Sequence, residues 1–81
     1  MIKVYLLKEF EDLKEYGFTK EPQGVCYELK LETYNIFIWN RKDNIDYEYK
    51  RVYIEFKDHN MILEDFYTLY TMIIRGVIGY E

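Results

Sequence analysis

One thiol and one imidazole are the side chains of this sequence best suited to nucleophilic and acid–base catalysis. Cys26 and His59 are the only cysteine and the only histidine, so a cysteine–histidine nucleophile would have to be built from this pair. A catalytic cysteine needs an orienting base and an electropositive setting. Cys26 instead falls in the middle of a strand pattern beside Glu28, and His59 falls in a loop before a helix. We expect Cys26 to pack and His59 to be solvated, with no catalytic residue in the chain.

Metal and phosphate sites also lack their ligand patterns. Zinc needs three or four Cys, His or carboxylate ligands at set spacing, which one Cys and one His cannot supply. The acidic segment 43–48 puts Ile45 at a ligand position of a calcium loop and lacks the glycine of that loop. The four glycines are too far apart to form a phosphate-binding loop. We predict no metal, no cofactor and no enzymatic activity.

Composition limits the class of protein and its compartment. With 49% hydrophobic and 32% charged side chains over 81 residues, the chain should fold as one domain spanning residues 1–81. The net charge of −4 disfavours nucleic acid as a partner. A lone cysteine excludes an internal disulfide and indicates a reducing cytoplasm. The first residues, up to Phe18, have neither a signal-peptide core nor a membrane span. We therefore expect a cytoplasmic protein with no membrane association.

Two helix patterns flank a series of strand patterns. The first helix is predicted over residues 8–16, with Gly17 as its C-cap and Phe18 folding back onto it. The last helix is predicted to begin at an Asn60 N-cap and to end at Gly76. Its apolar residues at three- and four-residue spacing predict a buried stripe, made of Ile62, Phe66, Leu69, Tyr70, Ile73 and Val77.

Strand patterns fill the middle of the chain. Alternation predicts strands over 25–31 and 47–57, and between them a strand that contains Ile36 and Ile38. A reversal is expected near residues 32–35, because the apolar side chains change parity there, and a turn is expected at 40–44. A short pattern near the start leaves open whether Met1–Leu7 joins the sheet. We predict an α+β fold: an antiparallel sheet of three or four strands with two helices on one face, in the order (β)-α-β-β-β-α.

Strand parity places several large side chains on the face of this sheet that the helices leave uncovered. An apolar patch of more than a few hundred Å² on a small protein marks an interface. Three alternatives stay open: A/T-rich codon usage raises the aromatic content to 20% by itself, the parity is wrong at the Tyr47–Tyr49 end, or a loop and the first strand cover this face as a second small core. The predicted face consists of Phe37, Trp39, Tyr47, Tyr49, Arg51 and Tyr53.

Three kinds of partner compete for such a face. Another protein is the first hypothesis, with Trp39 and Tyr53 as anchors and Arg51 adding polar specificity, because Trp, Tyr and Arg dominate protein contacts. A homodimer through the same face is the second, since two-fold self-association hides an apolar patch. Single-stranded nucleic acid is the third, because its bases stack on exposed rings. The net charge of −4 makes it the least favoured.

The ends of the two predicted helices carry a resemblance. Tyr16–Gly17–Phe18 closes the first, and the string from Leu69 to Ile78 closes the last with the form LY-x-x-I-x-x-G. This arrangement resembles small uncharacterised proteins of phages and mobile elements from low-GC Gram-positive bacteria. Such proteins are often accessory factors, including inhibitors that bind host defence machinery such as CRISPR nucleases. The resemblance implies protein binding in the host cytoplasm and transfers no functional residue.

Overall fold

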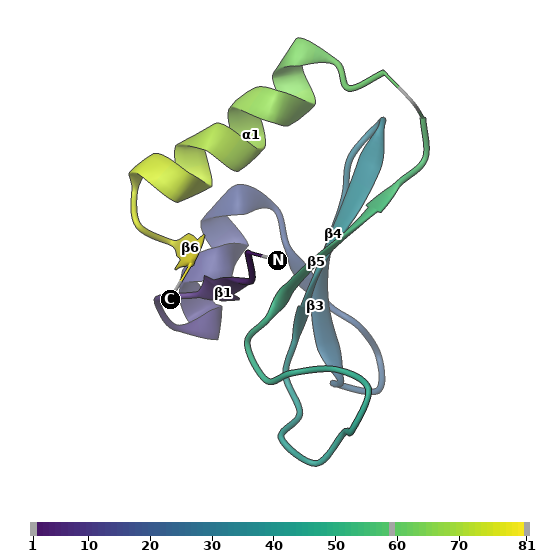
Figure 1. Ribbon diagram of the computed structural model, residues 1–81, viewed down its shortest axis with the longest axis vertical. Coiled ribbons are helices and arrows are strands. Elements are labelled where there is room, and N and C mark those ends of the chain that lie inside the picture. Colours follow the sequence, from purple (N-terminus) through teal and green to yellow (C-terminus); the bar gives the residue numbers. More distant parts are fainter. Residues whose placement is uncertain (1, 59, 81) are drawn as a thin grey trace.

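The chain folds into two antiparallel sheets, one 3₁₀-helix and one α-helix, which the computed structural model describes for residues 2–58 and 60–80. The predicted α+β class is confirmed. Figure 1 shows η1 and α1 to one side of the main sheet. In chain order the elements are β1 (Val4–Leu6), η1 (Phe10–Tyr16), β2 (Thr19–Lys20), β3 (Cys26–Lys30), β4 (Tyr34–Trp39), β5 (Val52–Phe56), α1 (Leu63–Ile74) and β6 (Ile78–Tyr80).

The main sheet has the order β2-β3-β4-β5, and each strand runs antiparallel to its neighbours. β3 and β4 form a tight hairpin, in which the Leu31 N–H donates a hydrogen bond to the Tyr34 carbonyl at 2.9 Å. The reversal predicted near residues 32–35 is confirmed, with Glu32 and Thr33 forming the loop. It lets the apolar side chains of both strands reach the same face despite their change of parity.

The inner face of the sheet forms the core together with both helices. Alternate residues of β4, namely Tyr34, Ile36 and Ile38, are fully buried. They belong to one apolar cluster that also contains Leu13 of η1 and Met72 of α1. The residues between them in β4 are only half-buried, because their side chains point to the opposite face. This strand therefore alternates as predicted.

The terminal strands form a second, smaller sheet. β1 pairs with β6 in antiparallel register, and an isolated bridge links Tyr5 of β1 to Arg51, the residue just before β5. The first strand thus meets the main sheet at a single residue pair, which resolves the question that the sequence left open. Neither β6 nor β2 was predicted, because strands of three and two residues are too short to show an alternation.

The first helix is a 3₁₀-helix rather than an α-helix, and it begins at Phe10 instead of residue 8. Glu9 is its N-cap, and the Asp12 carboxylate accepts a hydrogen bond from the Glu9 N–H at 3.0 Å. This capping box satisfies an N–H group of the chain just before the helix and so sets its start. The helix ends as predicted, at Gly17 with φ 91°, and Phe18 folds back into the core.

The last helix begins later and ends where it was predicted to end. Ile62 is the N-cap of α1, so the prediction that Asn60 caps it is wrong. At the other end Gly76 has φ 69°, and the N–H groups of Gly76 and Val77 donate back to carbonyls of the last turns. This is the Schellman arrangement, which favours glycine at the left-handed position.

The predicted stripe is confirmed only in part: Val77 belongs to the core cluster and Leu69 packs against it, but α1 turns the rest of the stripe away from the core. Its buried residues are Asp65 and Met72. The cause is polar, because the Asp65 carboxylate accepts hydrogen bonds from the Thr33 N–H at 2.8 Å and from the Thr33 hydroxyl at 2.6 Å. These bonds hold the Asp65 side of the helix against the β3–β4 hairpin. Three members of the predicted stripe are consequently about half exposed: Phe66, Tyr70 and Ile73.

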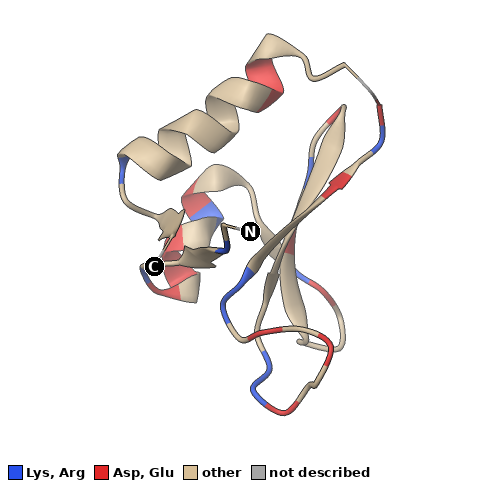
Figure 2. Cartoon of the chain, in the orientation of Figure 1, with Lys and Arg blue, Asp and Glu red and all other residues tan. Residues whose placement is uncertain are grey.

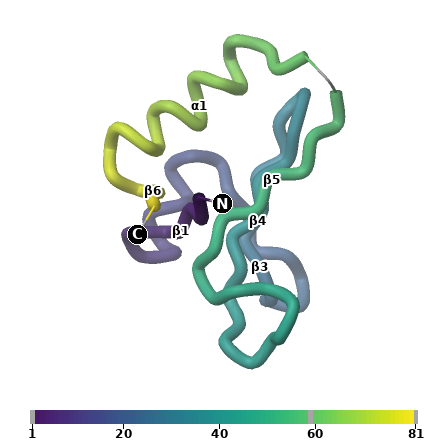
Figure 3. Tube along the Cα trace, viewed as in Figure 1, coloured from purple at the N-terminus to yellow at the C-terminus, as the bar shows by residue number. Residues whose placement is uncertain are grey.

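The strand predicted over 47–57 is shorter than expected, since β5 begins at Val52. Lys50 has φ 68°, outside the extended region. The Lys50 N–H donates to the Trp39 carbonyl, while the Arg51 carbonyl accepts from the Trp39 N–H. Two residues therefore face one residue of β4, which is a bulge that interrupts the alternation. The chain before it forms the long loop at the lower end of the trace in Figure 3.

Candidate binding site on the sheet face away from the helices

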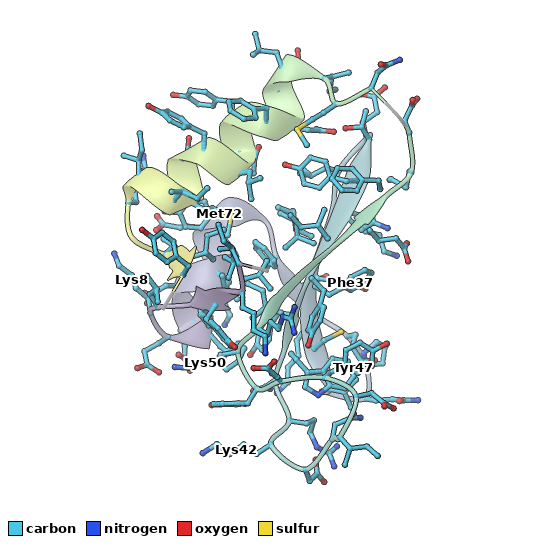
Figure 4. The ribbon with its side chains drawn as sticks, in the orientation of Figure 1. Lys8, Phe37, Lys42, Tyr47, Lys50 and Met72 are labelled. Carbon is cyan, nitrogen blue, oxygen red and sulfur yellow. The ribbon has the colours of Figure 1, made fainter. Side chains whose placement is uncertain are left out.

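Three of the predicted residues share the sheet face that points away from the helices. Phe37 lies directly opposite Tyr53 in the register of β4 and β5, and Trp39 lies two residues further along β4. Side chains two apart on a strand project to the same side. Figure 4 shows Phe37 on the side of the sheet away from α1, with Met72 on the helix side.

The loop between β4 and β5 brings a fourth ring to this face. The turn predicted at 40–44 lies in this loop, and the Asn44 side chain accepts a hydrogen bond from the Tyr47 N–H at 3.2 Å. The Tyr47 ring stacks on Trp39 at 4.4 Å between centroids and meets Tyr53 edge-on at 5.2 Å. Tyr47 therefore reaches the face from a turn rather than from a strand. Each such pair stabilises the arrangement by about 0.5–1.5 kcal/mol beyond burial.

These rings line a concave site, which we call the aromatic pocket. Its volume is about 270 Å³, below the roughly 300–1,000 Å³ of sites for drug-sized ligands, so it suits a single side chain. Tyr47, with 43% of its surface exposed, is the most accessible of its rings. The lining residues are Cys26, Phe37, Trp39, Tyr47, Tyr53 and Glu55.

Two lining residues of the aromatic pocket were not predicted. Glu55 follows Tyr53 at the same parity, and this spacing could have identified it as a residue of the same face. Cys26 pairs with Trp39 across β3 and β4. Its alternation with Glu28 and Lys30 places Cys26 on the same face, and the register with β4 then sets it beside Trp39. The carboxylate and the thiol change a purely aromatic patch into a chemically mixed site.

The environment of Cys26 suppresses its reactivity. Its side chain is buried, and burial raises the pKa of the thiol, with the nearby carboxylates of Glu21 and Glu28 raising it further. A raised pKa disfavours the thiolate, which is the nucleophilic form. His59, the base that the sequence offered as its partner, lies outside the described residues. The lining of this site offers ring surfaces for packing and the Glu55 carboxylate for electrostatic attraction.

Arg51 lies beside the aromatic pocket rather than in it. Its guanidinium is 5.0 Å from the centre of the Tyr53 ring and 3.1 Å from the Glu48 carboxylate. The same carboxylate accepts hydrogen bonds from the Lys3 ammonium at 2.8 Å and the Tyr5 hydroxyl at 2.5 Å. These two bonds lower the pKa of Glu48 to about 2. Arg51 therefore belongs to a charged network that joins β1, the loop and β5.

Tyr49 departs from the predicted face altogether. Its ring centre lies 6.0 Å from that of Phe10, a residue of the core cluster, and 4.9 Å from the Lys42 ammonium. The prediction assumed a continuous strand through Tyr49. The bulge at Lys50 breaks that strand, so parity no longer relates Tyr49 to Tyr53. Tyr49 is thus excluded from the lining of the aromatic pocket.

A second apolar surface lies on the outside of α1. Figure 2 shows most of this helix without charge, with acidic residues only in its first turn and a basic residue where it ends. Between α1, β5 and the terminal sheet runs a groove of about 260 Å³, whose apolar lining includes Val52, Ile54 and Ile78. The exposed large hydrophobic side chains of α1, which we call the outer surface of α1, are Leu63, Phe66, Tyr67, Tyr70, Ile73 and Ile74.

Metal ligation and membrane insertion find no basis in the described part of the chain. Across 2–58 and 60–80, no group of three or more His, Cys, Asp or Glu is placed to hold a metal ion. Within those same residues, no helix has the length and apolar character needed to cross a membrane. Comparison with known proteins returns no relative: no family model, no curated protein and no solved structure matches this chain.

Proposed function

We propose that this chain is a small, non-enzymatic protein that binds another protein through the aromatic pocket. The observation that carries the proposal is the convergence of four large rings on the sheet face away from the helices, in a concave site. Trp and Tyr are the residues that most often dominate protein contacts. A catalytic role finds little support, because the Cys26 thiol is buried with a raised pKa.

The arrangement of the rings favours binding on energetic grounds. Tyr47 stacks on Trp39 and contacts Tyr53 before any partner arrives. A partner would therefore meet a site whose side chains have already lost much of their rotamer freedom, which reduces the entropic cost of association. Tyr47 and Trp39 serve as the anchors in this proposal, with Tyr53 holding both the ring cluster and the loop in place.

The proposed partner is a host or phage protein in the cytoplasm of the host cell. The resemblance to phage and mobile-element accessory proteins supports this origin, and inhibition of a host defence protein, such as a CRISPR nuclease, is the role that fits a small binder of this kind. The residues of the resemblance surround Gly17 and Gly76, which form left-handed helix caps. The two glycines serve folding, so the resemblance supports the origin and identifies no binding residue in the pocket.

The first test is affinity capture from nuclease-treated host lysate. The wild-type chain is compared with Tyr47→Ala and Trp39→Ala, and bound proteins are identified by mass spectrometry. We expect the wild type to capture a specific protein that both variants fail to capture. Each substitution should weaken the binding free energy by about 2 kcal/mol or more. Tyr80→Ala is the matched control, because Tyr80 is 76% exposed and lies on β6, away from the pocket.

Folding must be separated from binding in this test. Tyr47 lies in a loop and is 43% exposed, so its replacement should leave a folded chain with a wild-type circular dichroism spectrum. The thermal midpoint should fall only by what the two lost ring contacts contribute. Capture that persists in a folded Tyr47→Ala variant would contradict the proposal. Loss of capture with Tyr80→Ala as well would show that the contact is made elsewhere.

A homodimer is the second candidate, and the outer surface of α1 is the observation that favours it. Leu63, Tyr67 and Ile74 are 80%, 66% and 62% exposed, and contiguous apolar area of this kind marks a contact surface. The dimer would then form through α1 rather than through the sheet face. Sedimentation over a wide concentration range tests it, with Ile74→Lys as the disrupting variant. A constant monomer mass would exclude it.

A further inference from the structure

The aromatic pocket combines ring surfaces with negative charge, and this combination selects the charge of its ligand. We propose that the pocket binds a cationic side chain, the guanidinium of an Arg or the ammonium of a Lys, presented by the protein partner. The inference rests on the proposed function and adds the chemistry of the contact. Cations are attracted to the faces of Trp, Tyr and Phe rings within about 6 Å of the centroid.

The carboxylates lie where such a cation would need them. Glu55 lines the pocket, and Glu28 lies directly opposite Phe37 in the register of β3 and β4. Both therefore project from the same face as the rings. Among the ion pairs within residues 2–58 and 60–80, the acidic partners are Glu48 and Asp43, which leaves the charges of Glu28 and Glu55 to act on an incoming cation.

Two further observations agree with a negative potential in the pocket. The carboxylates of Glu21 and Glu28 add to burial in raising the pKa of the Cys26 thiol, so their field reaches the pocket lining. The whole chain carries a net charge of −4, which attracts basic partners at long range. Lys30 also projects from this face, in the same cross-strand row as Asn35 and Glu55. Neither Lys30 nor Glu28 lines the pocket, so Glu55 is the charge in its lining.

The protein already contains a cation held in the proposed manner. The Arg51 guanidinium lies 5.0 Å from the Tyr53 ring centre and 3.1 Å from the Glu48 carboxylate. A ring and a carboxylate thus hold one guanidinium next to the pocket. The pocket repeats the combination with more rings, with Glu55 as its carboxylate and with a volume suited to one side chain. Arg is also enriched in protein interfaces.

The only tryptophan of the chain provides a direct readout, because Trp39 lines the pocket. Its fluorescence is followed during titration with N-acetyl-arginine amide, N-acetyl-lysine amide and, as the uncharged control, N-acetyl-glutamine amide. We expect a saturable change with one or both cations and none with the glutamine compound. Equal responses to all three compounds, or no saturable response to either cation, would overturn the inference.

Two variants locate the binding. Glu55→Gln should weaken cation binding by about three- to five-fold, as expected for one partly solvent-exposed charge pair. Tyr47→Ala should weaken it by about five- to ten-fold through the lost ring face. Glu64→Gln removes the same charge from an exposed position on α1 and should leave binding unchanged. Equal weakening by the Glu55 and Glu64 variants would reduce the effect to net charge and overturn the inference.

A last arm separates this inference from the proposed function. The captured partner is eluted with arginine amide and, in parallel, with sodium chloride at equal ionic strength. Elution by arginine amide alone supports a cationic contact in the pocket. If capture depends on Tyr47 but arginine amide does not elute the partner, the proposed function stands and the inference of a cationic ligand is overturned. Fluorescence-detected cation binding without any captured partner would support the pocket chemistry and count against the proposed function.

Discussion

The hydroxyl of Tyr34 offers the sharpest test of how α1 is held against the sheet. Tyr34 is fully buried at the start of β4, and its hydroxyl donates a hydrogen bond to the backbone carbonyl of Asp65 in the first turn of α1. Burial raises the pKa of Tyr34 to about 12, so the hydroxyl stays protonated and remains a donor at any ordinary pH. Tyr34→Phe removes this donor and keeps the ring.

The loss of stability expected for Tyr34→Phe depends on the hydrogen bonds that the Asp65 carbonyl still accepts. In an α-helix the carbonyl of residue 65 also accepts the N–H of residue 69, and a carbonyl oxygen has two lone pairs. The acceptor is therefore not left wholly unsatisfied, and the cost should be near the net value of one hydrogen bond, about 1 kcal/mol. For a domain of this length that corresponds to a fall of about 4–8 °C in the thermal midpoint.

Thermal and urea unfolding followed by circular dichroism measure this loss. Tyr80→Phe makes the same chemical change at a side chain that is 76% exposed and should leave the midpoint unchanged. If Tyr34→Phe is as stable as the wild type, the hydrogen bond to α1 does not contribute as argued. Equal losses in both variants would point to a general effect of the substitution instead.

Three other perturbations test separate parts of the fold. Gly76→Ala should lower the unfolding free energy by about 1–2 kcal/mol, because alanine disfavours the left-handed backbone at this position. A steric clash does not add to this cost, since nothing lies within 4 Å of the added methyl. An unchanged urea midpoint would contradict this expectation. Met72→Ala should lower the unfolding free energy by about 2–5 kcal/mol. Ile73→Ala should lower it far less, because Met72 is fully buried and Ile73 is 52% exposed. A larger loss for Ile73→Ala would support the predicted stripe instead. The pKa of Glu48 is lowered from 4.5 to about 2. The contribution of its carboxylate to the stability of the fold is therefore complete above pH 4.5 and is lost as the pH falls towards 2. The stability difference between wild type and Glu48→Gln should therefore shrink over this range, and a constant difference would refute the assignment.

Features that depend on neighbouring residues were readable from the sequence. Gly17 and Gly76 each follow a helical stretch and adopt a left-handed conformation, which only local backbone sterics require. The change of apolar parity near Thr33 likewise indicated a hairpin, because one continuous strand would have exposed half of its apolar side chains. The grouping of Phe37, Trp39 and Tyr53 follows from strand parity in the same way.

Features that depend on contacts between distant residues were not readable. The face that α1 turns inward is chosen by Asp65, which bonds Thr33 on the hairpin. Hydrophobic spacing alone favoured a rotated face, which shares Leu69 with the observed one but is centred on Phe66, Tyr70 and Ile73. The bulge at Lys50 arises where Trp39 meets two residues of the other strand, and it removed Tyr49 from the predicted face. Both outcomes depend on partners that lie more than ten positions away along the chain.

Local patterns were enough for the α+β class, the order of the long elements, the two glycine caps and a face of aromatic residues, because periodicity and backbone sterics act over a few neighbouring residues. The fold settled which residues of this face line the pocket, because strand register sets Cys26 beside Trp39 and leaves Lys30 outside the lining. It also decided that Tyr47 reaches the pocket from a loop. The charge of the pocket, and with it the kind of ligand we propose, therefore comes from strand pairing rather than from any motif.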